Sequence, residues 1–402
     1  MSPRPDSGRA ATLEQLFATK EIVVCCGSGG VGKTSVAAAA ALGAATRLGG
    51  KTLVLTIDPA RRLATALGLD GIGNEAHRVP EEVLKTAGLE PRGELWAAML
   101  DTKQSWDDLV RRHARDTATA NRILENRLYT SLTARFVQSH DYIAMERLFE
   151  IHASGEYDLI VVDTPPTRNA VDFLDAPKRM SEFFGGRLVR WLTMPYRVGG
   201  KRSMRMINFA SRPFYQVADR VLGSKFLEDI AEFFLNFQGM YEGFVERADA
   251  VETLMHDRRT TFAVVTTLEA APLYEAENFC TVLRERGFHL GAMVLNKTLP
   301  DSLLDPDGAA AAAKFCEESG PLADALATLA NPTLADTVRT ARVLRTIGES
   351  YSNFSVVAMR EAELRAELAR VPDVVVRVPT FENDISDVES LVAISGVLYG
   401  DS

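Results

Sequence analysis

One short glycine-rich segment constrains this chain more than any other feature. The sequence Gly27-Ser28-Gly29-Gly30-Val31-Gly32-Lys33-Thr34 follows an apolar run at 22–26 and precedes an alanine-rich stretch at 35–45. This order predicts a strand, a tight glycine turn and a helix. Glycines let successive backbone N–H groups converge on one anion, and the start of a helix adds partial positive charge. The segment is therefore predicted to bind a phosphate group.

The last two residues of the segment indicate which phosphate compound it binds. Lys33 can reach the outer phosphates of a nucleoside triphosphate, and the hydroxyl of Thr34 can bind Mg²⁺. The same glycines also satisfy the looser Gly-x-Gly-x-x-Gly pattern of dinucleotide sites, in which Asp58 would bind the ribose. A dinucleotide site has no use for a Lys-Thr pair, whereas a triphosphate with its metal needs one. We therefore favour the triphosphate and keep the dinucleotide as a distant alternative.

The rest of the chain alternates between short apolar runs and helical stretches. The runs lie at 22–26, 52–57, 95–100, 157–162, 262–266, 290–295 and 374–378. Such alternation predicts an α/β fold with a doubly wound, mostly parallel sheet, covered by helices on both faces. A late segment, 335–370, predicts one long helix or two short ones.

Two long segments, 102–155 and 169–260, carry no strand signal. The second is predicted to be a helical insertion subdomain. We expect the nucleotide-binding domain to comprise 1–168, including the helical segment 102–155, together with 261–402. The insertion at 169–260 is then a candidate client-binding subdomain.

Composition limits the partners and the compartment. The 402 residues include 54 acidic and 45 basic side chains, a net charge of −9, which argues against a nucleic-acid partner. No uncharged apolar run is long enough to cross a bilayer, and the first eleven residues lack the apolar core of a signal peptide. We expect a cytoplasmic protein, with a peripheral position at a membrane as the further option.

The cysteines give little support for a metal or a disulfide. They lie at 25, 26, 280 and 316, with no Cys-x-x-Cys spacing, and the six histidines show no ligand spacing either. Cys25 and Cys26 are adjacent on a predicted strand, where side chains alternate between the two faces. We expect small buried thiols and no zinc.

Two acidic residues end predicted strands. Asp58 follows the run at 52–57, and Asp163 follows the Leu-Ile-Val-Val run at 159–162. Ligands bind at the carboxyl ends of strands in an open parallel sheet, so both carboxylates are expected to face the phosphates. An acid after an apolar strand suits the Mg²⁺ shell, which is predicted for Asp163 through a water molecule, and a second acid suits orientation of the attacking water, predicted for Asp58. Each alone has the simpler alternative of a strand-end turn acid.

With these residues the chain resembles the P-loop ATPases that include the arsenite-pump ATPase and the tail-anchored-protein targeting ATPase. Besides the loop, Asp58-Pro59-Ala60 is similar to the family's first switch and the segment 163–167 to its second. The resemblance implies a P-loop NTPase fold with ATP and Mg²⁺ as cofactors. It also implies a dimeric switch protein that hydrolyses ATP, with Asp58 and Lys33 as the catalytic residues and Thr34 and Asp163 holding the metal.

The resemblance also implies where the base lies. Asn296 is similar to the family's adenine-reading asparagine, and Pro379 and Phe381 belong to a segment similar to the loop that covers the base. An asparagine amide offers both a donor and an acceptor to the adenine edge. The expected cofactor-binding residues are therefore Gly27, Ser28, Gly29, Gly30, Val31, Gly32, Lys33, Thr34, Ser35, Asn296, Pro379 and Phe381.

The chain departs from the family's pattern at three places. Members usually carry a lysine at the position of Ser28, which reaches the partner's phosphates, and Arg168-Asn169 follows the second switch in place of Gly-His. The zinc clasp and a metalloid-binding cysteine set are absent, so an arsenite-pump function is less favoured. We expect a homodimer, or a heterodimer with a paralogous ATPase that supplies the lysine. The alternative is an ATP-binding pseudo-enzyme or a regulatory subunit of a heteromeric ATPase.

A basic stretch within the insertion has the composition of a client surface. Residues 176–225 carry eleven lysines or arginines and two acids, interleaved with methionines and aromatic residues such as Trp191, and Phe233, Phe234 and Phe237 follow. Flexible apolar side chains beside cations suit a hydrophobic client helix, or a membrane-associated partner at an anionic surface. The simpler alternative is a packed helical subdomain with a solvated charged face.

Overall fold

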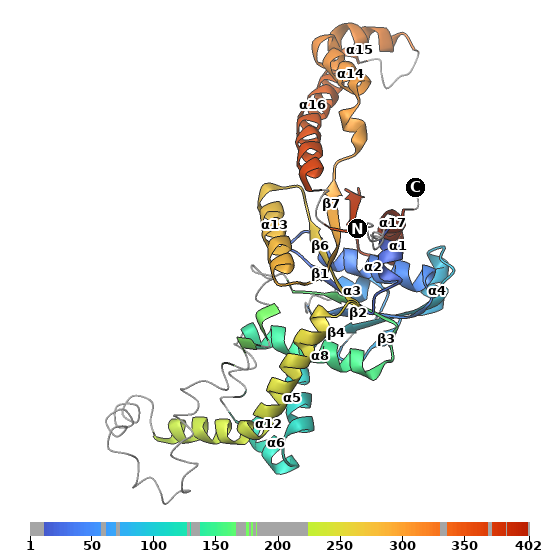
Figure 1. Cartoon of the computed structure of the whole chain (residues 1–402). Coiled ribbons are helices and arrows are strands. Elements are labelled where there is room, and N and C mark those ends of the chain that lie inside the picture. Colours follow the sequence, from blue (N-terminus) through green and yellow to red (C-terminus); the bar gives the residue numbers. More distant parts are fainter. Residues whose placement is uncertain are drawn as a thin grey trace, which may run out of the picture.

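The computed structural model describes residues 12–57, 62–69, 73–126, 129, 137–165, 174–176, 178–179, 182, 224–329, 336–368, 372–382 and 384–400. Within these residues eight strands form one sheet in the order β3-β4-β2-β5-β1-β6-β7-β8 (Figure 1). All neighbouring strands run parallel except β3 and β4. The predicted α/β fold with a doubly wound, mostly parallel sheet is confirmed.

Each of the seven predicted apolar runs coincides with a strand. The strands are β1 (Ile22–Cys26), β2 (Gly50–Thr56), β3 (His77–Arg78), β4 (Gly93–Met99), β5 (Leu159–Asp163), β6 (Thr260–Thr266), β7 (Leu290–Thr298) and β8 (Val374–Pro379). The sequence analysis did not predict β3, because its two residues are polar and exposed and pair only with β4 at the sheet edge.

Helices cover both faces of the sheet. They are α1 (Leu13–Phe17), α2 (Lys33–Arg47), α3 (Arg62–Ala66), α4 (Glu81–Thr86), α5 (Thr102–His113), α6 (Thr117–Leu124), α8 (Val137–Ser154), α12 (Ser224–His256), α13 (Ala270–Glu285), α14 (Pro306–Glu317), α15 (Ser319–Ala327), α16 (Thr337–Leu368) and α17 (Val388–Tyr399).

Strand β1 lies inside the sheet, between β5 and β6, and serves both cores. Ile22, Val24 and Cys26 pack in the core that also contains residues of α5, α8, α12 and α13. Val23 and Cys25 pack in the opposite core, with residues of α1, α2 and α17. The two neighbouring cysteines therefore point to opposite faces, as the strand alternation predicts.

Small residues let helix α2 approach its neighbours closely. The alanines at 37–41 are at most 2% exposed. Tyr399, the last residue of α17, donates its hydroxyl to the Ala40 carbonyl oxygen at 2.7 Å. Its ring lies over Gly43, where an added Cβ would be 2.1 Å from Tyr399 Cε2. The absence of a side chain at Gly43 therefore fixes the spacing between α2 and α17.

Helices α5, α6, α8 and α12 pack together as a helical lobe, seen below the sheet in Figure 1. Phe233 and Phe234 of α12 are only 1% and 7% exposed and belong to the core. The sequence analysis placed these two rings among client-binding side chains, and the structure corrects that, because they stabilise the lobe instead. Most of the basic stretch 176–225 lies outside the described residues. The client surface and the domain boundaries stay predictions.

Helices α14, α15 and α16 form an arm that projects from the opposite end of the molecule (Figure 1). The arm lies between β7 and β8 in the sequence. Helix α16 packs closely on the rest of the arm. An added Cβ at Gly348 of α16 would lie 2.5 Å from the Ala312 carbonyl oxygen of α14, and Tyr351 of α16 donates its hydroxyl to the Ser302 carbonyl oxygen at 2.9 Å. The structure shows α16 as a single helix of 32 residues, which decides between the two predicted arrangements.

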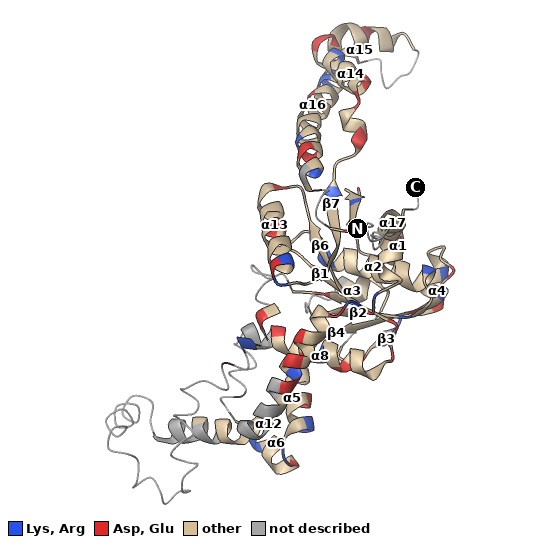
Figure 2. Cartoon of the chain, viewed as in Figure 1, with Lys and Arg blue, Asp and Glu red and all other residues tan. Residues whose placement is uncertain are grey.

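Charged side chains lie mainly on the outer helices. Figure 2 shows mostly uncharged strands and an uncharged middle of α2, whereas acidic and basic residues gather on α5, α8 and the arm. In the part of the chain that the structure describes, no helix combines the length and apolar character needed to cross a bilayer.

The contact between α2 and α17 generates a stability prediction. Gly43→Ala should lower the free energy of unfolding by about 1–3 kcal/mol, because the added methyl group overlaps the buried Tyr399 ring. Gly320→Ala in α15 is the matched control, since no heavy atom lies within 4 Å of its added Cβ, and it should leave stability unchanged or slightly raised. Urea denaturation measures both. Equal effects of the two substitutions would contradict the packing argument.

Candidate functional site

The phosphate loop joins β1 to α2 at the centre of the sheet. Gly32 caps the helix with a left-handed backbone, φ +88°, and an added Cβ there would lie 2.3 Å from Asn296 Nδ2. At the other end of the loop, an added Cβ at Gly27 would lie 2.0 Å from the Val265 carbonyl oxygen. The Val265 backbone therefore excludes a side chain at Gly27, and the left-handed backbone disfavours one at Gly32.

Lys33 is the first residue of α2, and its side chain bends back onto the loop. Its Nζ donates to the Ser28 carbonyl oxygen at 2.7 Å, and the residue is 6% exposed. A buried ammonium group needs hydrogen-bond acceptors, and the loop carbonyl is one of them. The lysine charge is thus held beside the backbone that is predicted to bind phosphate. The Ser28 hydroxyl is buried and has no hydrogen-bond partner among the described residues.

Asp163 accepts hydrogen bonds from two hydroxyl groups at the carboxyl end of β5. Thr34 Oγ1 donates to Asp163 Oδ2 at 2.7 Å, and Thr56 Oγ1 donates to the same oxygen at 2.9 Å. Thr56 lies opposite Asp163 in the pairing of β2 with β5. Asp163 is 1% exposed, so these bonds stabilise its negative charge. The sequence analysis did not include Thr56, although its place at the end of a predicted strand was a usable signal.

This pair of groups fits a magnesium ion. A carboxylate and a threonine hydroxyl are hard oxygen ligands, which Mg²⁺ prefers over nitrogen or sulfur. Thr34 and Asp163 are brought together from the start of α2 and the end of β5. They are the residues that would hold the metal beside the phosphates.

Of the two predicted switch segments, the first, which begins at Asp58 and ends at residue 60, lies outside the described residues, and the second, 163–167, is described only at 163–165. At the start of the second switch, Thr164 donates its hydroxyl to the Cys25 carbonyl oxygen at 2.8 Å, which ties it to β1. The catalytic role of Asp58 stays a prediction.

Two consecutive residues near the end of β7 contact the phosphate loop. Asn296 Nδ2 donates to the Val31 carbonyl oxygen at 2.7 Å, and Lys297 Nζ donates to the Gly30 carbonyl oxygen at 3.0 Å. The Asn296 side chain is 8% exposed and its adenine-binding role stays a prediction. Lys297 was not among the predicted site residues, and its position directly after Asn296 was the only sequence signal for it.

Pro379 and Phe381 lie on the neighbouring strand and just after it. Pro379 is the pairing partner of Thr298, and the Thr380 N–H donates to the Thr298 carbonyl oxygen at 3.0 Å. Phe381 packs partly buried against the core that contains α2. Both residues therefore lie at the same edge of the sheet as Asn296, and their contact with a base stays a prediction.

Three cysteine thiols, those of Cys25, Cys26 and Cys280, are buried and have low reactivity. Burial raises the pKa of Cys25 and Cys26 well above the ordinary value, and it raises the pKa of Cys280 to about 11. The thiolate is the form that binds metals and attacks electrophiles, so these three side chains are poor ligands and nucleophiles at neutral pH. Cys316, in the arm, is half-buried.

A comparison with protein families identifies the chain. The model of a family described as anion-transporting ATPase matches residues 20–319, which include the phosphate loop, Asp163 and Asn296. The chain belongs to the anion-transporting ATPase family. This confirms the resemblance that the loop and the strand-end residues predicted, and the family name supports the predicted class of enzyme.

Named relatives of this anion-transporting ATPase family member are distant. A Malassezia globosa protein named ATPase GET3 is 23% identical over 299 residues, which cover 73% of this chain and 78% of its own length. A Chlorobaculum tepidum protein provisionally named an arsenical pump-driving ATPase is 25% identical over 287 residues, covering 69% of this chain and 61% of its own. An uncharacterised Streptomyces coelicolor protein, SCO2128, is 28% identical over 280 residues, covering 68% and 62%. The matched part thus spans about three fifths of the last two relatives.

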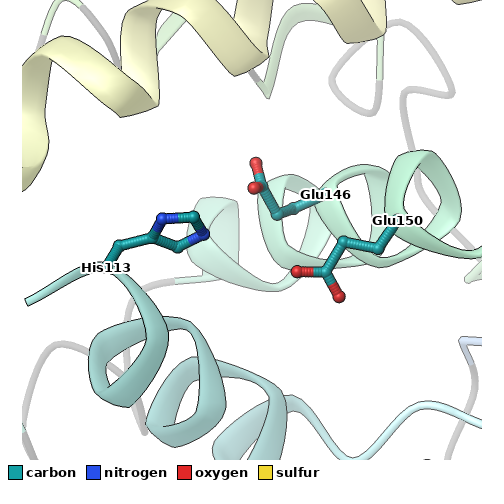
Figure 3. Close-up of side chains that lie close together, drawn as sticks. All are labelled: His113, Glu146 and Glu150. Carbon is teal, nitrogen blue, oxygen red and sulfur yellow. The ribbon is translucent and has the colours of Figure 1, made fainter. Parts of the chain in front are cut away.

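A second group of ionisable side chains lies in the helical lobe of this ATPase family member (Figure 3). His113 ends α5, and Glu146 and Glu150 lie one turn apart on α8. One ligand atom from each lies within 4.8 Å of the others. A histidine and two carboxylates have the composition of a metal site, so the surrounding charge decides the interpretation.

Three arginines surround this group. Arg247 of α12 forms an ion pair with Glu146, and Arg112 and Arg147 both pair with Glu150, the latter at 3.1 Å. Three guanidinium groups outweigh two carboxylates, which opposes binding of a further cation. We interpret the group as a charged joint that ties α5, α8 and α12 together.

Burial controls the protonation of this joint. Burial raises the pKa of Glu146 more than the Arg247 guanidinium lowers it, and Tyr142 donates its hydroxyl to Glu146 Oε2 at 2.8 Å. Burial, followed by the charges of Arg247 and Arg112, lowers the pKa of His113. His113 is therefore neutral at pH 7, and the negative charge of Glu146 depends on Arg247 and Tyr142.

The joint generates a second stability prediction. Arg247→Met should lower the free energy of unfolding by about 3–5 kcal/mol, because it leaves the buried Glu146 carboxylate without its cation. Arg111→Met is the matched control, since Arg111 pairs with Asp108 at the surface and its loss should cost under about 1 kcal/mol. Chemical denaturation compares the two variants. Similar losses would refute the joint, and a Glu150-dependent rise in thermal midpoint with Mn²⁺ or Zn²⁺ would show a metal site instead.

Proposed function

We propose that this protein is a Mg²⁺-dependent ATP hydrolase that works as a dimeric switch. The observation that supports this most strongly is the 2.7 Å contact between Thr34 and Asp163, next to a loop against which Lys33 is held. A phosphate-binding backbone, a lysine and two hard oxygen ligands at one sheet edge are the parts that phosphoryl transfer needs. Family membership supports ATP as the nucleotide.

The proposed reaction is attack of water on the γ-phosphorus, with cleavage of its bond to the β-phosphate oxygen and release of ADP, phosphate and a proton. Asp58 would orient the water, and the loop N–H groups with Lys33 would stabilise the charge that shifts onto the leaving oxygen. Mg²⁺, when bound by Thr34 and Asp163, would neutralise charge on the β- and γ-phosphates. Thr164 would couple the second switch to the loop, and its hydrogen bond to the Cys25 carbonyl oxygen supports this.

The dimer is part of the same proposal. Ser28 replaces the lysine that members of the resembled family extend across the dimer, so a homodimer would lack this cation at both sites. A heterodimer with a paralogous ATPase would supply it. The alternative function follows from the same residue: without a supplied lysine, the chain would be an ATP-binding pseudo-enzyme or regulatory subunit, which turnover assays with and without the paralogue distinguish.

The client is proposed to be a hydrophobic helix or a membrane-associated partner. The positive charge and the Met and aromatic content of 176–225 support this, together with the GET3 name of one relative. The name of another relative assigns arsenical pumping, but the buried, protonated Cys25, Cys26 and Cys280 of this chain do not suit metalloid binding. Hydrogen exchange over 176–241 with and without ATP tests the proposal, which requires protection to change with the nucleotide.

Two substitutions separate phosphate binding from water orientation. Lys33→Ala should reduce ATP affinity and lower kcat by about 100-fold or more, because it removes the lysine charge from the loop. Asp58→Asn should lower kcat by about 100-fold while keeping the ATP Kd within about threefold, because it removes only the acid that orients water. Calorimetric ATP titration and steady-state phosphate release measure both effects.

The exposed Lys85, which pairs with Glu81 on α4, provides the control. Lys85→Ala should change neither affinity nor turnover. Equal loss of ATP affinity in the Lys33 and Asp58 variants would reject the role assigned to Asp58. Failure of the unaltered chain to bind ATP with Mg²⁺ would reject the proposed function.

A further inference from the structure

Two carbonyl groups of the phosphate loop accept hydrogen bonds from side chains of β7, a strand that is not adjacent to β1. The phosphate loop leaves β1, and β6 lies between β1 and β7 in the sheet. Asn296 and Lys297 of β7 nevertheless reach across to the consecutive carbonyl oxygens of Val31 and Gly30, at 2.7 and 3.0 Å. The end of β7 therefore holds the outer side of the loop backbone.

Both side chains can reach the loop only because β7 departs from regular strand geometry. Consecutive side chains of a strand point to opposite faces, so Asn296 and Lys297 would normally diverge. Lys297 has φ +57°, and it is the single non-glycine residue with positive φ in the described part of the chain. The pairing register between β7 and β8 shifts between Leu295 and Thr298, at the same place. The backbone twist thus turns the lysine toward the loop.

A left-handed backbone is unfavourable for lysine and is cheapest for glycine. Such conformations persist where the surrounding structure determines them, and they concentrate at functional sites. Glycine at 297 would remove the strain but also the contact with Gly30. Lys297 therefore adopts an unfavourable backbone conformation in which its side chain can bond to the Gly30 carbonyl oxygen.

We propose that Lys297 is a positioning residue that holds the phosphate loop in the conformation that binds nucleotide phosphates, with Asn296 as the second anchor. The inference rests on the proposed function of the loop as an ATP site. A loop that turns its N–H groups toward an anion leaves carbonyl groups on its outer side, and these need donors. The ammonium group of the exposed Lys297 makes a charge-assisted bond to one of them, and such bonds are roughly twice as strong as bonds between neutral groups.

The proposal predicts opposite effects on stability and on nucleotide binding. Lys297→Gly should leave the thermal midpoint of the nucleotide-free protein equal or higher, because it relieves the left-handed backbone. The same variant should weaken binding of ADP with Mg²⁺ by about tenfold, because the loop keeps only the Asn296 anchor. Lys297→Met should weaken ADP binding to a similar degree. Lys297→Arg, which keeps a charged donor, should bind within about threefold of the unaltered chain.

Calorimetric titration of the full chain with Mg²⁺ and ADP, beside thermal unfolding without nucleotide, makes the test. Lys314→Met on α14, in the distant arm, is the control and should bind normally. Normal ADP affinity in the glycine and methionine variants overturns the role of Lys297, and so does a loss of affinity that merely follows a lowered thermal midpoint. If the unaltered chain binds no ADP while remaining folded, the proposed function itself fails, and the positioning role fails with it.

Discussion

The need to satisfy the backbone of one glycine-rich loop organises the functional end of this protein. The loop leaves the sheet at β1, and three other strands contribute to holding it. Thr164 after β5 bonds to Cys25 of β1 just before the loop, the Val265 carbonyl group of β6 lies against Gly27, and Asn296 and Lys297 of β7 bond to the loop carbonyls. Because the neighbouring strands run parallel, all of these groups meet at one edge of the sheet.

The carboxylate that is proposed to hold Mg²⁺ also influences the register of the strands. Asp163 Oδ2 accepts bonds from Thr34 at the start of α2 and from Thr56 on β2. A shift of β2 against β5 by one residue would turn Thr56 to the other face, so the pairing is set by this polar contact as well as by the apolar core. The carboxylate that is proposed to hold the metal thus also contributes to the assembly of the sheet.

The sequence predicted the parts of the fold that depend on local pattern. The strands of the central sheet were recognisable because each is an apolar run between helical stretches, and the loop was recognisable because its glycines and Lys-Thr pair have few other uses. The polar strand β3 has no such pattern. The burial of Phe233 and Phe234 depends on packing of α12 against distant helices, which no local pattern reveals. Lys297 was overlooked for a similar reason, since its role depends on a backbone twist that becomes visible only in three dimensions.

The arm of α14, α15 and α16 is a part of the chain that could change in length while the sheet stays the same. It leaves the sheet after β7 and returns to it at β8, and these two strands pair directly through residues such as Thr298 and Pro379. The family match ends at residue 319, inside the arm. The entropy lost when a connection is closed grows only with the logarithm of its length, so paired strands tolerate a long excursion almost as well as a short one. Strands β7 and β8, which carry Asn296 and Pro379, can therefore stay paired whatever the length of the arm between them. Helices of the arm could be gained, lost or exchanged without a change at the end of the sheet where the phosphate loop lies.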